Sequence, residues 1–120
     1  MKNGNLTSSF KNAINGLFYV IKSERNMKIH VIAAFLAISA GVILDLSPEE
    51  FLLVCFAVCM VIVSEIFNTA IELIVDVIVD IYHPKAKIIK DIAAGGVLVS
   101  AIFAVVVGYV VFYDKLTALF

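Results

Sequence analysis

The chain has 120 residues, of which 62% are apolar, and its mean hydropathy is +1.07. This length predicts a single domain, and the composition is typical of an integral membrane protein and excludes an ordinary soluble globular domain. The net charge of −1 says little, but the charged residues are unevenly distributed along the chain.

Basic residues are concentrated in two segments. Of nine Lys and Arg residues, five precede residue 29 and three lie in segment 85–90, whereas segment 45–50 carries only acids. Because cytoplasmic loops of membrane proteins are enriched in Lys and Arg, the N-terminus and segment 85–90 are predicted to be cytoplasmic. Eight of the nine basic residues agree with this topology. No signal peptide is expected, because residues 1–28 lack an apolar core.

An amphipathic helix is predicted over about residues 8–26, after a disordered segment 1–6. Ser8 or Ser9 is expected to cap it. Its apolar side recurs at helical spacing, at Phe10, Ile14, Leu17 and Ile21, with polar residues opposite. This helix is too polar to cross a bilayer, so we expect it to lie on the cytoplasmic membrane surface.

Three transmembrane helices are predicted, over about residues 29–45, 49–81 and 91–113. Ser47 and Pro48 suit the start of the second helix, and Pro84 is expected to end it. At about 1.5 Å per residue the second helix would be about 50 Å long, against a hydrocarbon core of about 30 Å. Its last ten or so residues should therefore project into the cytoplasmic headgroup region. The predicted fold class is an all-α membrane protein.

Several residues within these helices have more than one interpretation. Cys55 and Cys59 share a helix face and are expected to be buried packing residues. His30 could be a ligand, but a capping or interfacial role is favoured. The small residues around Ala94 and Gly95 indicate close helix packing, or a substrate lying against bare backbone.

A stripe of polar residues follows one side of the second helix. At about 100° per residue its members fall within a sector of about 120°, opposite apolar residues; they are Glu65, Asn68, Glu72, Asp76 and Asp80. A carboxylate buried in a membrane costs about 2.5–3.5 kcal/mol or more. Such acids are expected to bind a cation, take up protons or line a watery site, although Asp76 and Asp80 also fit a solvated face beyond the bilayer.

Other charged residues are predicted to lie at the same depth as this stripe. Glu24 precedes the first transmembrane helix, and Lys90 and Asp91 precede the third. Carboxylates with a lysine suit Mg²⁺ and polyphosphate, and phosphoryl transfer needs positioning, metal charge and a group that orients or deprotonates the attacking hydroxyl. The chain contains neither a Walker loop nor protein-kinase motifs, so a nucleotide site would be of another kind.

Three elements together identify a family resemblance. They are the run Glu65-Ile-Phe-Asn68-Thr-Ala-Ile-Glu72 with Asp76, the turn Tyr82-His83-Pro84, and Lys90-Asp91-Ile-Ala-Ala-Gly. With Ser23-Glu24-Arg25-Asn26, they resemble the prokaryotic diacylglycerol kinase family over nearly the whole chain. The likeness is greater to its undecaprenol kinase branch. One departure is Gly96, where a larger residue is expected, and this affects the expected fit of the substrate.

The resemblance implies a homotrimer with composite active sites near the cytoplasmic face. It makes Glu65 the catalytic base and Glu24 and Glu72 the Mg²⁺ ligands. The lipid substrate would meet Glu65, Ala94 and Gly95. The residues implied to bind ATP are Glu24, Asn68, Glu72, Asp76, Tyr82, His83, Lys90 and Asp91.

The expected function is an ATP-dependent lipid kinase of the bacterial cytoplasmic membrane that converts undecaprenol to undecaprenyl phosphate. Diacylglycerol, giving phosphatidic acid, is the alternative substrate. A small proton-coupled transporter or channel subunit is the alternative from another class, but the outer half of every predicted transmembrane helix lacks acids once the first turn of the second helix, with Glu49 and Glu50, is passed. A third alternative, a structural or assembly protein without catalytic activity, would leave the buried acids unexplained. No nucleic-acid partner is expected.

Overall fold

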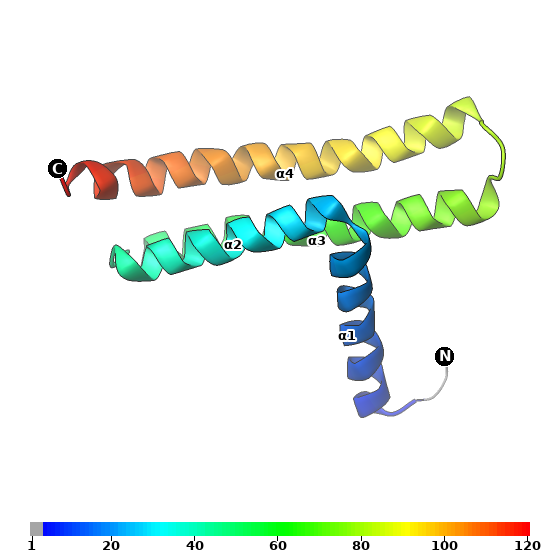
Figure 1. Cartoon of the computed structure of the whole chain (residues 1–120), viewed down its shortest axis with the longest axis horizontal. Coiled ribbons are helices and arrows are strands. Elements are labelled where there is room, and N and C mark those ends of the chain that lie inside the picture. The colour runs from blue at the N-terminus through cyan, green and yellow to red at the C-terminus, as the bar shows by residue number, and fades with distance from the viewer. Residues whose placement is uncertain (1–3) are drawn as a thin grey trace.

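The computed structural model describes residues 4–120, which form four helices joined by short connections (Figure 1). The helices are α1 (Leu6–Ser23), α2 (Arg25–Ile43), α3 (Pro48–Ile78) and α4 (Pro84–Thr117), and no strand occurs among the described residues. This confirms the predicted all-α fold. The expectation of a disordered segment 1–6 falls partly outside the described residues, and Leu6 is already helical.

Helix α1 is amphipathic and leaves the other three helices sideways (Figure 1). Its N-cap is Asn5, whose side chain accepts a hydrogen bond from the backbone N–H of Ser8, so the prediction of Ser8 or Ser9 as the cap was wrong. An asparagine three residues earlier satisfies the same free N–H groups of the first turn. Phe10 on the apolar side remains 63% exposed, which suits a helix lying in a membrane interface.

A single residue separates α1 from α2. Glu24 is extended (φ −109°, ψ 119°), so α1 ends at Ser23 and not near residue 26 as predicted. The Glu24 side chain does not cap α2, and it is therefore available for other contacts. Met27, one turn further on, is fully buried and anchors the start of α2.

The connection from α2 to α3 is a tight turn ended by a capping box. Ser47 Oγ accepts from the Glu50 N–H, and Glu50 Oε1 accepts from the Ser47 N–H. Pro48 occupies the first turn of α3, where its missing N–H is harmless. The predicted roles of Ser47 and Pro48 are thus confirmed.

The connection from α3 to α4 differs from the prediction. Helix α3 ends at Ile78, and Pro84 begins α4. We had expected α3 to continue to residue 81 and the third long helix to start near residue 91. A proline fits the first turn of a helix as well as it stops one, and His83 becomes the N-cap by accepting from the Lys85 N–H.

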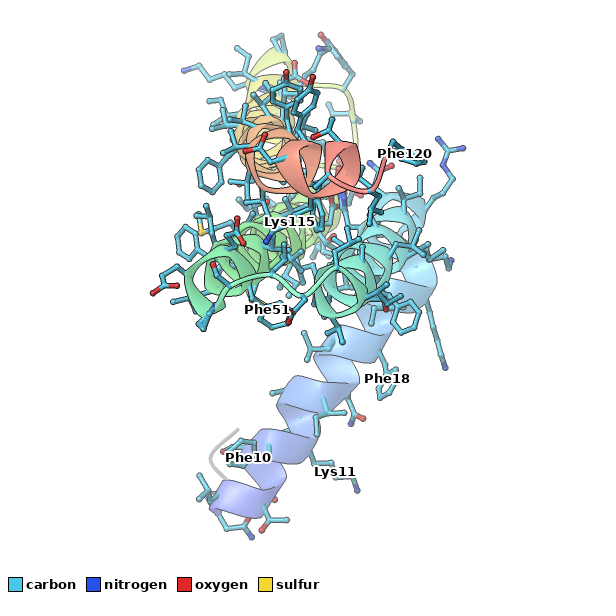
Figure 2. The ribbon with its side chains drawn as sticks, turned by 90° about the vertical axis from the view of Figure 1, so that its left-hand side faces the viewer. Phe10, Lys11, Phe18, Phe51, Lys115 and Phe120 are labelled. Carbon is cyan, nitrogen blue, oxygen red and sulfur yellow. The ribbon has the colours of Figure 1, made fainter. Side chains whose placement is uncertain are left out.

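Helix α3 is central, with α4 packed antiparallel along it and α2 on another side, whereas α2 and α4 scarcely touch. Figure 2, viewed along the bundle from the end that carries Phe51 and Lys115, shows this arrangement. At that end the core is a cluster of Leu46, Val54, Ala57, Val107 and Val111. Cys55 is half-buried and Cys59 is exposed, so the prediction of two buried cysteines was wrong for Cys59.

Three of the helices, α2, α3 and α4, are long and apolar enough to cross a membrane. Helix α3 has 31 residues and is about 46 Å long, which exceeds a hydrocarbon core of about 30 Å. Helix α1 leaves the bundle near the middle of α3, and the α3–α4 turn lies well beyond that level (Figure 1). If α1 lies on the membrane surface, the end of the α3–α4 hairpin projects from the membrane.

Candidate active site

Glu65 is the most deeply buried charged residue described, with a relative exposure of 1%. It lies on α3, and Asn68, one turn later, donates from Nδ2 to Glu65 Oε2 at 3.3 Å. On the facing helix α2, His30 Nε2 lies 3.6 Å from Glu65 Oε1. The two oxygens of this carboxylate therefore face different partners, an amide on the same helix and an imidazole on α2.

Three buried polar atoms around Glu65 have no hydrogen-bond partner among residues 4–120. They are Glu65 Oε1, Asn68 Oδ1 and Thr69 Oγ1. Each unsatisfied buried polar atom costs about 1–3 kcal/mol, and native proteins contain few of them. Three such atoms within two turns of one helix make this part of α3 the candidate site.

Glu24 and Glu72 lie further toward the α3–α4 turn than Glu65. Glu72 is two helical turns after Glu65 on α3, about 10 Å along the axis. The negative charges of Glu24 and Glu65 both act on Glu72, and Lys90 of α4 provides the opposing positive charge. The structure thus brings four of the predicted site residues within electrostatic range of one another.

The carboxylates of Glu24 and Glu72 fit a magnesium ion. No group of three or more His, Cys, Asp or Glu side chains that could hold a metal occurs in the described part of the chain. Mg²⁺ commonly takes only one or two protein carboxylates and completes its six ligands with water and phosphate oxygens. Two half-buried acids beside a third carboxylate, balanced by one lysine, are suited to such an ion.

Two ion pairs lie near the start of α4. Lys90 Nζ contacts Asp76 Oδ1 of α3 at 2.5 Å, and Lys87 Nζ contacts Asp91 Oδ2 at 2.7 Å. These side chains are between 38% and 63% exposed, so each pair contributes little to stability. The first pair joins the two arms of the hairpin and holds Lys90 near the acidic stripe.

A pocket of about 240 Å³ lies at the end of the α3–α4 hairpin. Four residues predicted to bind ATP line it, namely Asp76, Tyr82, His83 and Lys90. Two other members of that predicted set lie elsewhere: Asn68 is buried beside Glu65, and Asp91 pairs with Lys87.

Ala94 and Gly95, predicted to meet the lipid, lie on α4, where Ala94 is exposed and Gly95 is half-buried. Neither residue lines the hairpin pocket or the apolar groove that begins at His30. A Cβ placed on Gly95 or on Gly96 would meet no atom within 4 Å. The larger residue that the family resemblance leads us to expect at position 96 would therefore also find room within one chain.

The sequence favoured a capping or interfacial role for His30 over a ligand role, and the capping role was wrong. The cap residue of α2 is Glu24, and His30 instead points its imidazole at Glu65. Thr69 was not predicted to be a site residue, although its buried hydroxyl belongs to the same cluster. The only sequence signal for His30 was that it is the sole ionisable side chain between Lys28 and Asp45.

The chain is similar to known proteins. A family profile described as prokaryotic diacylglycerol kinase matches residues 11–112. The chain is 41% identical over 105 residues to a diacylglycerol kinase of Synechocystis sp., covering 87% of this chain and 60% of that protein. It is 37% identical over 108 residues to an undecaprenol kinase of Bacillus subtilis, covering 90% of this chain and 88% of that protein.

The family match spans all four helices and includes Glu24, Glu65, Glu72 and Lys90. Together with three long apolar helices, it identifies a multi-pass membrane protein. The chain belongs to the prokaryotic diacylglycerol kinase family.

Proposed function

We propose that this chain, a lipid kinase of that family, transfers the γ-phosphoryl group of ATP to undecaprenol. The observation that carries the proposal is the buried Glu65 carboxylate. Its Oε1 is unpartnered and faces His30, at one end of an apolar groove between α2, α3 and α4. Similarity to the Bacillus undecaprenol kinase over 88% of its length supports this lipid. Diacylglycerol is the second candidate, because the Synechocystis relative carries that name.

Glu65 is the proposed base. In the reaction, the lipid hydroxyl oxygen attacks the γ-phosphorus, ADP leaves, and the hydroxyl proton passes to Glu65 Oε1. Asn68 donates a hydrogen bond to Glu65 Oε2, and His30 lies beside Glu65 Oε1. These two contacts fix the position of Oε1, the atom that accepts the proton. A positioned base of this kind contributes about 10²–10⁴-fold to a rate.

Glu24 and Glu72 would hold Mg²⁺, which supplies positive charge to the β- and γ-phosphates. Both acids lie on the side of Glu65 that faces the α3–α4 turn. The phosphates would then reach Glu65 from that side, while the lipid alcohol reaches it from the membrane.

The pocket at the hairpin end is the proposed place for the rest of ATP. Asp76, Tyr82, His83 and Lys90 line it, and Lys90 supplies a cation beside the acids. Asp91 lies one residue further on and pairs with Lys87, and we assign it to the rim of the same site.

The proposed assembly is a homotrimer in the bacterial cytoplasmic membrane, with the N-terminus and the α3–α4 turn in the cytoplasm. The distribution of Lys and Arg supports this orientation. Ala94 and Gly95 of α4 would meet the lipid in this assembly.

The proposal is tested with the purified protein, radiolabelled ATP and Mg²⁺, and equal mole fractions of undecaprenol or diacylglycerol in the same bilayer. We expect kcat/KM to be larger for undecaprenol. A preference for diacylglycerol would make the chain a diacylglycerol kinase, and no transfer to either lipid would contradict the assignment.

A further inference from the structure

Helices α1 and α2 meet at a single residue. Glu24 is extended and lies between α1, which ends at Ser23, and α2, which begins at Arg25 (Figure 1). Its N–H donates to the Val20 carbonyl oxygen of α1 at 3.0 Å, and its own carbonyl oxygen accepts from the Lys28 N–H of α2 at 3.3 Å. The backbone of this proposed magnesium ligand is therefore the joint that sets the direction of α1 relative to α2.

The angle at this joint also sets the direction of the Glu24 side chain. A residue has only two soft backbone dihedrals, and ψ is the rotation between its Cα and its carbonyl carbon. A change in ψ at Glu24 therefore turns α1 and the Glu24 side chain together relative to α2. A contact that fixes this angle also fixes where the Glu24 carboxylate lies relative to Glu72 of α3, which lies within range of its charge.

Packing alone holds α1 to the rest of the chain at few points. Val20 is the one buried residue of α1, all 18 residues of which the structure describes. The carbonyl groups of the last turn of a helix lack helical N–H partners, and a positive charge beside them is favourable. Lys28 of α2 supplies both a donor and a charge, because its Nζ donates to the Lys22 carbonyl oxygen at 2.8 Å. Among the side-chain hydrogen bonds of residues 4–120, only this one joins α1 to α2.

We propose that Lys28 is a positioning residue for Glu24. Its ammonium group ties the first turn of α2 to the last turn of α1 across the joint, and thereby holds the Glu24 carboxylate where it can share a magnesium ion with Glu72. Lys28 acts through the backbone of α1 and needs no contact with the ion, with ATP or with the lipid. The inference rests on the proposed magnesium role of Glu24 and adds the residue that places it.

The first test measures metal binding without turnover. The protein in a bilayer, with the non-hydrolysable β,γ-imido analogue of ATP, is titrated with Mn²⁺ as the probe for Mg²⁺, and the free ion is followed by electron paramagnetic resonance. Lys28→Met removes the ammonium group, and we expect it to weaken Mn²⁺ binding by about 3–10-fold, the factor that one net hydrogen bond is worth. Loss of a positive charge near acids would by itself strengthen cation binding, so the expected change has the opposite sign to a charge effect.

Two matched variants separate the tie from other effects of the substitution. Lys28→Arg keeps a long cationic donor and should bind Mn²⁺ within about twofold of the wild type. Lys22→Met removes a positive charge from the residue that contributes only its main-chain carbonyl to the tie, and it should bind Mn²⁺ as the wild type does. Unchanged or stronger binding in Lys28→Met, or equal weakening in Lys28→Met and Lys22→Met, would overturn the inference.

The second test measures the joint without metal or nucleotide. Spin labels are placed at two exposed positions, Asn12→Cys of α1 and Leu36→Cys of α2, with the two native cysteines replaced by Ala and the protein diluted with unlabelled chains. Double electron–electron resonance then gives the distribution of distances between the labels. We expect Lys28→Met to broaden or shift this distribution and Lys22→Met to leave it unchanged. A wild-type distribution in Lys28→Met would overturn the inference.

Glu24→Gln in the Mn²⁺ titration separates this inference from the proposed function. If Glu24→Gln and Lys28→Met both weaken Mn²⁺ binding, both are supported. If only Glu24→Gln weakens it, Glu24 still holds the ion and the positioning role of Lys28 alone is overturned. If Glu24→Gln binds Mn²⁺ as tightly as the wild type, the magnesium role of Glu24 fails, and the positioning role fails with it.

Discussion

His30 on α2 and Glu65 on α3 face each other across the interface of two helices, with His30 Nε2 3.6 Å from Glu65 Oε1. The contact joins residues 35 positions apart and involves the most deeply buried acid described. It lies where the acidic stripe of α3 ends and the apolar groove begins. The proposed base is thus placed between a polar approach for phosphate and an apolar approach for lipid.

The imidazole of His30 is expected to orient the Glu65 carboxylate. His30→Leu removes the imidazole beside Oε1 and should lower kcat, whereas His30→Gln retains an N–H donor of similar reach and should recover much of the rate. Steady-state kinetics with undecaprenol check this, and the KM for ATP should not change in either variant. Ser39→Leu, a change to a half-buried polar residue further along α2, is the control for general disruption. If His30→Gln is as impaired as His30→Leu, the donor has no role.

Glu24 and Glu72 are expected to hold the same magnesium ion. Glu24→Gln and Glu72→Gln should each raise the Mg²⁺ concentration needed for half-maximal rate by about 10–10²-fold, as expected for losing a charge-assisted contact of about 1.5–3 kcal/mol. The double variant should be much less impaired than the product of the two single effects, because the site is already lost. Independent, multiplying losses would mean that the two acids serve separate sites.

The Asp76–Lys90 pair is expected to serve ATP binding more than stability. Each single variant, Asp76→Asn or Lys90→Met, should lower the thermal stability only slightly, because the pair is exposed and screened by solvent. Each should nevertheless raise the KM for ATP. The exchanged pair Asp76→Lys with Lys90→Asp should restore thermal stability but not the KM. If the exchanged pair restores both the thermal stability and the KM for ATP, the ion pair serves only to hold α3 and α4 together.

The orientation in the membrane is tested by cysteine labelling. With Cys55 and Cys59 replaced by Ala, single cysteines at Glu49 and Lys87 are exposed to a membrane-impermeant maleimide in intact cells and in inverted vesicles. We expect Glu49→Cys to react from outside and Lys87→Cys from the cytoplasmic side. The reverse pattern would place the acidic stripe away from cytoplasmic ATP and contradict the site.

Local features of the fold could be predicted from the sequence. Ser47 and Pro48 were identified as the start of α3 because capping depends on neighbours within one turn. The acidic stripe was identified because the residues of one helix face follow from helical periodicity alone. Pro84 was misread because proline fits the first turn of a helix and also ends one, and only the packing of α4 on α3 decides between them.

Contacts between helices could not be predicted in this way. Whether His30 meets Glu65 depends on the rotation and register of α2 against α3, which are set by many small packing contacts. The groove depends on the same packing, because it is the space left where α2 and α4 fail to meet. The sequence identified the candidate site residues but not the contacts between helices that bring them together.

The most direct test of the account is the turnover of undecaprenol by Glu65→Gln. Glutamine keeps the shape of the side chain and its contact with Asn68, but it cannot accept the hydroxyl proton. We expect kcat to fall by about 10²–10⁴-fold with the protein still folded, because removing a charge from the membrane relieves an energetic penalty. Glu49→Gln, the same change at an exposed acid, is the control and should retain wild-type kcat. If Glu65→Gln turns over undecaprenol at a rate near that of the wild type, Glu65 is not the base and the proposed site is contradicted.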